Sequence, residues 1–380
     1  MRLPLTAFKG QNAWEQVELN DIADKSTLKN RKNENKIVLT NSAELGIVKQ
    51  QDYFDKDIAN SKNLSNYYVV KNNYFVYNPR ISNQAKYGPI NYNSLGIVGI
   101  MSPLYFVFKV HNNVNNIFLG VLFKTSVWHR FMYENGDTGA RADRFSIKDS
   151  VFMTMPLNIP SITEQSKIAK LFQSLDKTIT LHEEQHRRLE QLKKALLQKM
   201  FADETGYPAL RFKGFTENWK QSYLKDIASV NSGRDYKHLN KGNIPVYGTG
   251  GYMLSVDKAL SNTKDGIGIG RKGTINNPYI LRAPFWTVDT LFYVIPYNID
   301  LNFLYGIFQK IDWRKKDEST GVPSLSKENI NKTKFKIPAI SEQKKIGIIF
   351  QNLDSLITLH QHKIHNLKRL KRALLQKMFV

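Results

Sequence analysis

Residues 159–202 of this chain read IPSITEQSKIAKLFQSLDKTITLHEEQHRRLEQLKKALLQKMFA, and residues 337–380 read IPAISEQKKIGIIFQNLDSLITLHQHKIHNLKRLKRALLQKMFV. The two segments align at a constant offset of 178 without a gap, and 25 of their 44 positions are identical. The stretches before each copy are long and dissimilar. This repeat predicts a scaffold that presents two different surfaces in one fixed geometry.

Each copy of the repeat has the apolar pattern of one long helix. Apolar residues recur mostly three or four positions apart, and Leu192 and Leu370 fall on the two stripes. Thr163 and Ser341 are expected to cap the helices, which would then run for roughly 38 residues, or on the order of 57 Å. A helix with a single apolar stripe must bury it, and the nearest partner is the other copy. We therefore expect an antiparallel two-helix coiled coil in a near-twofold arrangement.

Histidines occupy equivalent core-like positions in the two copies. His182 and His360 could form a pH-sensitive or metal-binding pair, or a hydrogen-bonded pair packed in the coil, and we favour the second interpretation. The residues expected in the coiled-coil core are Leu175, Ile179, His182, Leu189, Leu196, Leu353, Ile357, His360, Leu367 and Leu374.

Composition limits the class of protein. The chain has 380 residues, no cysteine and a formal net charge of +22. Disulfides, thiol nucleophiles and cysteine-bound zinc are therefore excluded. The sequence contains no run of 18 apolar residues that could span a membrane, and its N-terminus lacks the apolar stretch of a signal peptide. We therefore expect a cytoplasmic protein without a membrane partner. The charge favours a polyanionic partner, double-stranded DNA above all, although a generally basic proteome would also produce it.

The segments between the repeats have the pattern of mixed α/β domains. Trp14 recurs as Trp219, after which short β-branched and aromatic runs alternate with Gly, Asn and Pro turns. Residues 118–132 and 301–311 are predicted as short helices. We expect four parts: target-facing domains at 1–158 and 203–336, and helical regions at 159–202 and 337–380.

Two glycine motifs invite different interpretations. Gly268-x-Gly270-x-x-Gly273 matches the dinucleotide fingerprint, but a strand-like segment rather than a helix follows it, so a tight turn that exposes Arg271 is favoured over a cofactor site. That arginine could hold a phosphate, read a guanine edge or simply be solvated. The loops 138–141 and 320–323 each precede the last strand of a domain. Their small residues would let DNA approach the backbone closely, although a plain surface turn is the alternative.

The order of motifs resembles the specificity (S) subunit of type I restriction–modification systems over essentially the whole chain. The motifs VYGTGGY (246–252), GIGRKGT (268–274), PFWTVDTLFYV (284–294) and STGVPSLSKENI (319–330) carry the resemblance, followed by IPAISEQKKI (337–346). The first half resembles a different recognition type, with NSAELGIVKQQDYF (41–54), YFVYNPRIS (74–82) and TGARADRF (138–145).

The resemblance implies a non-catalytic subunit with two target-recognition domains that read the two halves of a bipartite, asymmetric DNA site. It implies that the helices dock two methyltransferase (M) subunits, which bind S-adenosylmethionine, and that a restriction (R) subunit using ATP and magnesium can join. No cofactor or metal is expected in this chain. The expected DNA-binding residues are Arg80, Ser82, Lys86, Tyr87, Gly139, Arg141, Arg144, Arg234, Tyr247, Thr249, Gly250, Gly251, Arg271, Lys272, Thr320, Gly321 and Val322.

Two rival functions make different demands on the sequence. A stand-alone DNA methyltransferase or nuclease requires a cofactor loop or an acidic cluster, and neither is visible in the sequence. A coiled-coil adaptor with no DNA role leaves the positive charge of the two divergent domains unexplained. Both are therefore less favoured than a DNA-specificity subunit.

Overall fold

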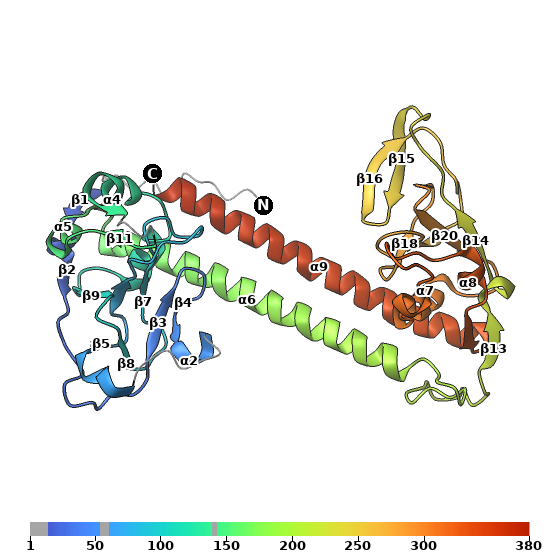
Figure 1. Ribbon diagram of the computed structural model, residues 1–380, viewed down its shortest axis with the longest axis horizontal. Coiled ribbons are helices and arrows are strands. Elements are labelled where there is room, and N and C mark those ends of the chain that lie inside the picture. The colour runs from blue at the N-terminus through green and yellow to red at the C-terminus, as the bar shows by residue number, and fades with distance from the viewer. Residues whose placement is uncertain (1–13, 54–60, 139–142, 380) are drawn as a thin grey trace. The chain divides into compact units, whose positions relative to one another are not determined.

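The structure is a computed structural model, and it describes residues 14–53, 61–138 and 143–379. Two compact units make up the chain: unit 1 comprises Met1–Leu181 and His365–Val380, and unit 2 comprises His182–Ile364. Each unit contains one globular domain and one part of each long helix (Figure 1). The mixed α/β class expected from the sequence is confirmed in both units.

Unit 1 is built around a four-stranded antiparallel sheet in the order β2-β9-β6-β7. The pairs β3-β4, β5-β8, β10-β11 and β1-β12 complete its strands. Its elements are β1 (Glu15–Glu18), α1 (Leu19–Ile22), β2 (Ala23–Lys25), β3 (Leu39–Ser42), β4 (Gly46–Lys49), α2 (Gln50–Tyr53), the 3-10 helix η2 (Ser61–Asn66), β5 (Tyr68–Val70), β6 (Phe75–Tyr77), β7 (Ile90–Tyr92), β8 (Gly99–Met101), β9 (Phe106–Val110), α3 (Asn116–Leu122), α4 (His129–Asn135), β10 (Asp137–Thr138), β11 (Phe145–Ser146), α5 (Asp149–Met153) and β12 (Pro156–Ile159).

Unit 2 has a four-stranded antiparallel sheet in the order β14-β20-β17-β18. A three-stranded sheet, β16-β15-β19, and the pair β13-β21 lie in the same unit. Its elements are β13 (Lys220–Tyr223), η3 (Leu224–Asp226), β14 (Ala228–Ser232), β15 (Lys241–Gly248), β16 (Gly251–Val256), β17 (Gly266–Gly270), β18 (Tyr279–Leu281), β19 (Trp286–Thr287), β20 (Leu291–Pro296), α7 (Leu301–Lys310), η4 (Trp313–Lys316), α8 (Lys327–Asn331) and β21 (Lys334–Ile337).

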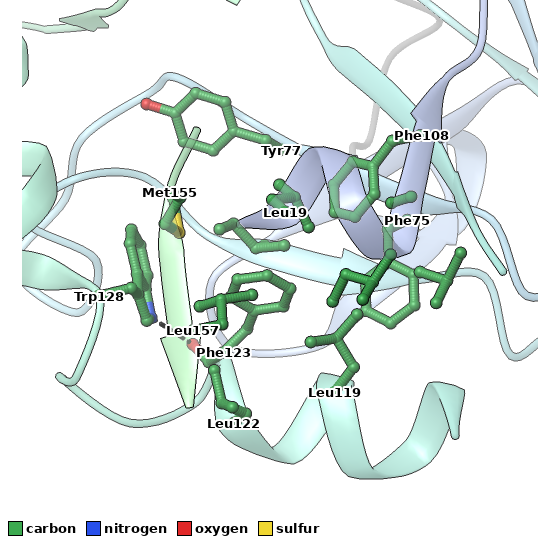
Figure 2. Packing of buried hydrophobic residues seen from close by; sticks show 14 of the residues in the cluster. Leu19, Phe75, Tyr77, Phe108, Leu119, Leu122, Phe123, Trp128, Met155 and Leu157 are labelled. Atoms are coloured by element: carbon green, nitrogen blue, oxygen red, sulfur yellow. Dashed lines mark hydrogen bonds between the residues drawn. The ribbon is translucent and has the colours of Figure 1, made fainter. Parts of the chain in front are cut away.

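The single helix expected over residues 118–132 is wrong, because the chain breaks there into α3 and α4. The indole Nε1 of Trp128 donates to the carbonyl of Phe123 across this break, at 3.2 Å (Figure 2). Unit 2 contains the same bond, from Trp313 to the carbonyl of Phe308 at 2.9 Å. The two domains therefore share a core motif although their sequences differ.

The repeat forms the long helices α6 (Ile162–Lys199) and α9 (Ile340–Met378). Both begin one residue before the expected caps Thr163 and Ser341, so those caps are wrong; the Ser161 hydroxyl accepts from the Glu164 amide instead. The helices pack antiparallel within each unit, as predicted. In unit 2, the Nδ1 atoms of His182 and His360 lie 3.0 Å apart, which confirms the hydrogen-bonded interpretation of this pair.

The buried face of each helix follows a heptad pattern, with spacings of four and three from Ile168 to Met200 and from Ile346 to Met378. All ten expected core residues are buried or half-buried. Leu192 and Leu370 were wrongly placed on the stripe, since they are 47% and 44% exposed. The heptad positions beside them belong to Lys193 and Lys371, which pair with Asp354 in unit 2 and Asp176 in unit 1.

Four aromatic rings join each domain to its helices. In unit 1, Phe379 packs edge to face on Trp14, stacks with Phe118 and contacts Phe172. Unit 2 repeats this cluster with Phe201, Trp219, Phe303 and Phe350. The C-terminal end of one helix and the N-terminal part of the other thus belong to the same core.

A buried glutamine fixes the start of each long helix against its domain. The Gln165 side chain accepts from the Asn115 amide at 2.9 Å and donates to the Pro160 carbonyl. Gln343 makes the equivalent bonds in unit 2.

Among the described residues, no helix combines the length and apolar character that a membrane crossing requires.

Candidate nucleic-acid interface

In unit 1, the segment after β6 pairs with the segment that leads into β11. Arg80 and Arg144 lie opposite each other in an isolated antiparallel bridge. The Ile81 amide donates to the Asp143 carbonyl, and the Phe145 amide donates to the Pro79 carbonyl. Two expected DNA-binding arginines, 64 positions apart, are therefore neighbours on one surface.

The turn after Arg80 places the next expected residues beside this bridge. Ser82 and Ala85 exchange backbone hydrogen bonds of 3.1 Å, and the exposed Lys86 lies 5.4 Å from the centroid of the Tyr87 ring. Tyr87 itself departs from the expectation of a surface contact. It is 7% exposed and packs edge to face on Phe145, so its ring supports the loop from the core side.

A network of asparagines holds this loop in place, and sequence reasoning missed it. Asn41 is 2% exposed and donates to the carbonyls of Val76 and Pro89. Asn78 donates to the Asn41 carbonyl at 2.8 Å and accepts from the Arg80 amide at 3.0 Å. Buried amides with satisfied hydrogen bonds make a rigid base for the arginine above them.

In unit 2, the turn after β17 lies against the loop before α8. The Gly273 amide donates to the Pro323 carbonyl, and the Leu325 amide donates to the Arg271 carbonyl. Arg271, Lys272, Thr320, Gly321 and Val322 are all exposed on this pair of loops. A strand, β18, follows the glycine motif, so its geometry is a turn and not the strand-to-helix junction of a dinucleotide site.

One carboxylate closes the 317–324 loop. An Asp317 oxygen accepts from the Ser319 amide, the Ser319 hydroxyl and the Ser324 amide at 2.8–3.0 Å. These hydrogen bonds, led by the one from the Ser324 amide, hold the pKa of Asp317 below its usual value. The Asp-x-Ser signature of an Asx turn is a sequence signal that could have indicated this closure.

The hairpin β15–β16 contributes a second exposed loop. Tyr252 is 64% exposed at its tip, and Gly251 has a φ of +109°, a conformation that L side chains rarely adopt. The hydroxyl of Tyr279 donates to the Gly248 carbonyl at 2.5 Å and ties the hairpin to the main sheet. Thr249 and Gly250 therefore sit in a shaped, anchored loop.

The segment 287–290 brings the loops of unit 2 together. The Arg234 amide donates to the Thr287 carbonyl, the Val288 amide to the Tyr247 carbonyl, and the Arg271 amide to the Thr290 carbonyl. Burial raises the pKa of Tyr293, and the charge of Arg234 offsets part of this rise.

The expected residues Gly139 and Arg141 of unit 1 lie outside the described residues.

The sequence matches the type I restriction modification DNA specificity domain over residues 11–191 and again over 216–369. The chain belongs to this family.

Individual specificity subunits are distant in sequence and similar in fold. The MjaVIII specificity subunit of a type I restriction enzyme from Methanocaldococcus jannaschii is 20% identical over 271 residues, which span 60% of this chain and 62% of that protein. The crystal structure of the S subunit of a type I system from M. genitalium matches with a TM-score of 0.66 at 17% identity, covering 98% of both chains. A chain from a structural study of complex assembly and conformational transition of the type I R-M system has a TM-score of 0.50 at 14% identity, covering 98% and 99%.

The chemistry of the loops in this specificity-family chain suits binding. Their side chains are cations, amides, hydroxyls and aromatic rings, which contact phosphates and base edges. In the described part of the chain, no group of three or more His, Asp or Glu side chains is arranged to hold a metal ion.

Proposed function

We propose that this chain is the DNA-reading subunit of a type I restriction–modification complex. Each globular domain reads one half of a bipartite, asymmetric DNA site, and the paired helices dock two methyltransferase subunits. The chain itself carries out no reaction. The methyltransferase subunits bind S-adenosylmethionine and transfer the methyl group, and a restriction subunit that uses ATP and magnesium cleaves DNA. The complex works in the cytoplasm.

One observation carries the proposal: the two units repeat their supports but not their exposed loops. The aromatic cluster around Phe379 or Phe201, the pinning glutamine and the tryptophan bond recur in both units. The loops differ, with paired arginines over an asparagine network in unit 1 and three loops joined at 287–290 in unit 2. Equivalent supports with different reading loops suit a site whose two halves differ in sequence.

The outer faces of the helices support docking of the same partner twice. Unit 1 exposes Leu181 and Leu370, and unit 2 exposes their repeat equivalents, Leu359 and Leu192, at 44–51%. Exposed leucines that recur at equivalent positions indicate an apolar contact used in both units. Leu370→Lys and Leu192→Lys should each remove one methyltransferase copy in native mass spectrometry. Ile348→Lys should remove none, because this exposed position is Lys170 in the other copy.

Domain exchange tests the reading function. Residues 1–158 are replaced by the corresponding domain of a relative, and adenine methylation is mapped across the host genome. We expect one half of the methylated motif to change and the other half to stay. A folded chimera that changes both halves would contradict the two-reader proposal, and methyl transfer by the purified chain alone would favour a stand-alone methyltransferase.

A further inference from the structure

Two arginines face each other at close range in unit 1. Arg80 and Arg144 form an antiparallel bridge, flanked by the backbone bonds from Ile81 to Asp143 and from Phe145 to Pro79, of 3.1 and 2.8 Å. This bonding pattern is that of a non-hydrogen-bonded antiparallel pair, whose Cα atoms are about 4.5 Å apart and whose side chains leave the same face. The two guanidinium groups therefore start from adjacent points on one surface.

The positive charge of this pair is poorly compensated. Like charges directly opposite each other on neighbouring strands are destabilising. The carboxylate of Asp143 lies 4.0 Å from Arg144, at the outer limit of an ion pair, and both side chains are about half exposed. Among the residues that the structure describes, no ion pair involves Arg80. An arrangement that weakens the free protein is expected where an anion is to be bound.

Both arginines line the same cavity of about 580 Å³. Asn78, Ser82 and Gln84 contribute uncharged polar groups to its wall, and Glu44 contributes a carboxylate. The asparagine network beneath Arg80 fixes its backbone, so the base of this side chain is held in place before a ligand arrives. A fixed backbone reduces the conformational entropy that is lost on binding.

We propose that Arg80 and Arg144 together clamp a single phosphate of the DNA backbone beside the half-site read by unit 1. This inference rests on the proposed DNA-reading function. A guanine edge is satisfied by one bidentate arginine, whereas phosphate oxygens accept bonds from several donors. Two adjacent guanidinium groups therefore fit one phosphate better than one base.

The test uses the full chain assembled with its methyltransferase. Binding is measured to a duplex carrying the motif that the host methylates and to a scrambled duplex of equal length, over a range of salt concentrations. The variants are Arg80→Gln, Arg144→Gln and the double variant. Arg130→Gln is the matched control, since Arg130 is an exposed arginine of the same unit whose charge already pairs with Glu134 at 2.7 Å.

If the two arginines share one phosphate, three results are expected. Each single variant should weaken binding to both duplexes by the same factor, on the order of tenfold, while Arg130→Gln binds as the parent does. The double variant should lose much less than the product of the single losses, with the slope of log affinity against log salt reduced by about 0.9 in total. The free variants should melt at or above the temperature of the parent, because like-charge repulsion is relieved.

Other results would overturn the clamp. Multiplicative losses with a slope change near 1.8 would mean two separate phosphates, and a loss confined to the methylated motif would mean base reading. Unchanged binding by all three variants would place the pair outside the interface. In each of these cases the parent complex still binds its motif; a parent that binds neither duplex would refute the proposed function as well.

Discussion

The ion pair between Lys193 and Asp354 is expected to fix the register of the helices in unit 2. The ammonium and carboxylate groups are 2.5 Å apart and only 16% and 31% exposed. Lys193 occupies a seam position of the heptad pattern, where a polar residue specifies one alignment at a cost in stability. Tyr305 covers the pair, and burial together with the charge of Asp354 raises the pKa of its phenol to about 12.

Removing one member of the pair leaves the other charge without its partner in the seam. An exposed pair contributes about 0.2–1 kcal/mol, and breaking a fully buried one costs about 3–5 kcal/mol. At intermediate burial, Asp354→Asn should cost about 2 kcal/mol, or about 4–8 °C in the melting of a unit of this size. The apolar double variant Lys193→Met, Asp354→Leu should recover most of this loss, because replacing both partners avoids the unpaired charge.

A double-mutant cycle on the full chain measures this coupling, and hydrogen exchange along 340–364 locates it. Lys332 and Glu328 give a matched control, since the side chains of that ion pair are 70% and 73% exposed and its loss should leave the melting temperature nearly unchanged. A cycle with no coupling, or a double variant as unstable as Asp354→Asn, would refute the register argument. The equivalent pair of Lys371 and Asp176 in unit 1 should behave alike.

Three single substitutions test other parts of the structure. Gly321→Ala adds a Cβ that meets nothing within 4 Å, so thermal stability should hold while DNA affinity falls if the backbone approaches DNA there; unchanged affinity would remove that loop from the interface. Burial, followed by the charges of His182, Lys363 and His186, lowers the pKa of His360 in the folded protein. The unfolded chain therefore takes up a proton at this histidine at a higher pH than the folded protein does, and stability should fall as the pH drops below about 6.5. His360→Gln should flatten this pH dependence of the melting temperature. Phe379→Ala should destabilise unit 1 by about 3–5 kcal/mol in denaturant titration, with exchange protection in 220–335 retained; a loss spread evenly over both units would contradict the assignment.

The long helices and their pairing could be predicted from the sequence because a heptad is a local pattern. Its polar members could not be assigned to the seam, since Lys193 and Lys371 interrupt the apolar stripe while Leu192 and Leu370 continue it. The strands also carried local signals. Their partners did not, because pairings such as β1 with β12 join residues more than 130 positions apart.

Prediction of the candidate interface was weaker for the same reason. Individual arginines and glycines were identifiable by residue type, but the opposition of Arg80 and Arg144 depends on a tertiary pairing. Side chains with equivalent roles in the two units can also come from different elements. Tyr92 of β7 covers Gly120 of α3 in unit 1, whereas Tyr305 of α7 lies beside the Lys193–Asp354 ion pair in unit 2. In both cases burial raises the pKa of the phenol, and the charge of the aspartate in the ion pair contributes to the rise.

The position of Phe379 has a consequence for synthesis on the ribosome. Its ring packs against Trp14, Phe118 and Phe172, so the core of unit 1 is incomplete until the last part of the repeat has been translated. At about 5–20 residues per second, the roughly 200 residues after Phe172 take on the order of 10–40 s to emerge. During that interval the nascent first domain exposes an unfilled aromatic face that a chaperone could cover. Unit 2 needs no such wait, because Phe201 precedes its own domain along the chain.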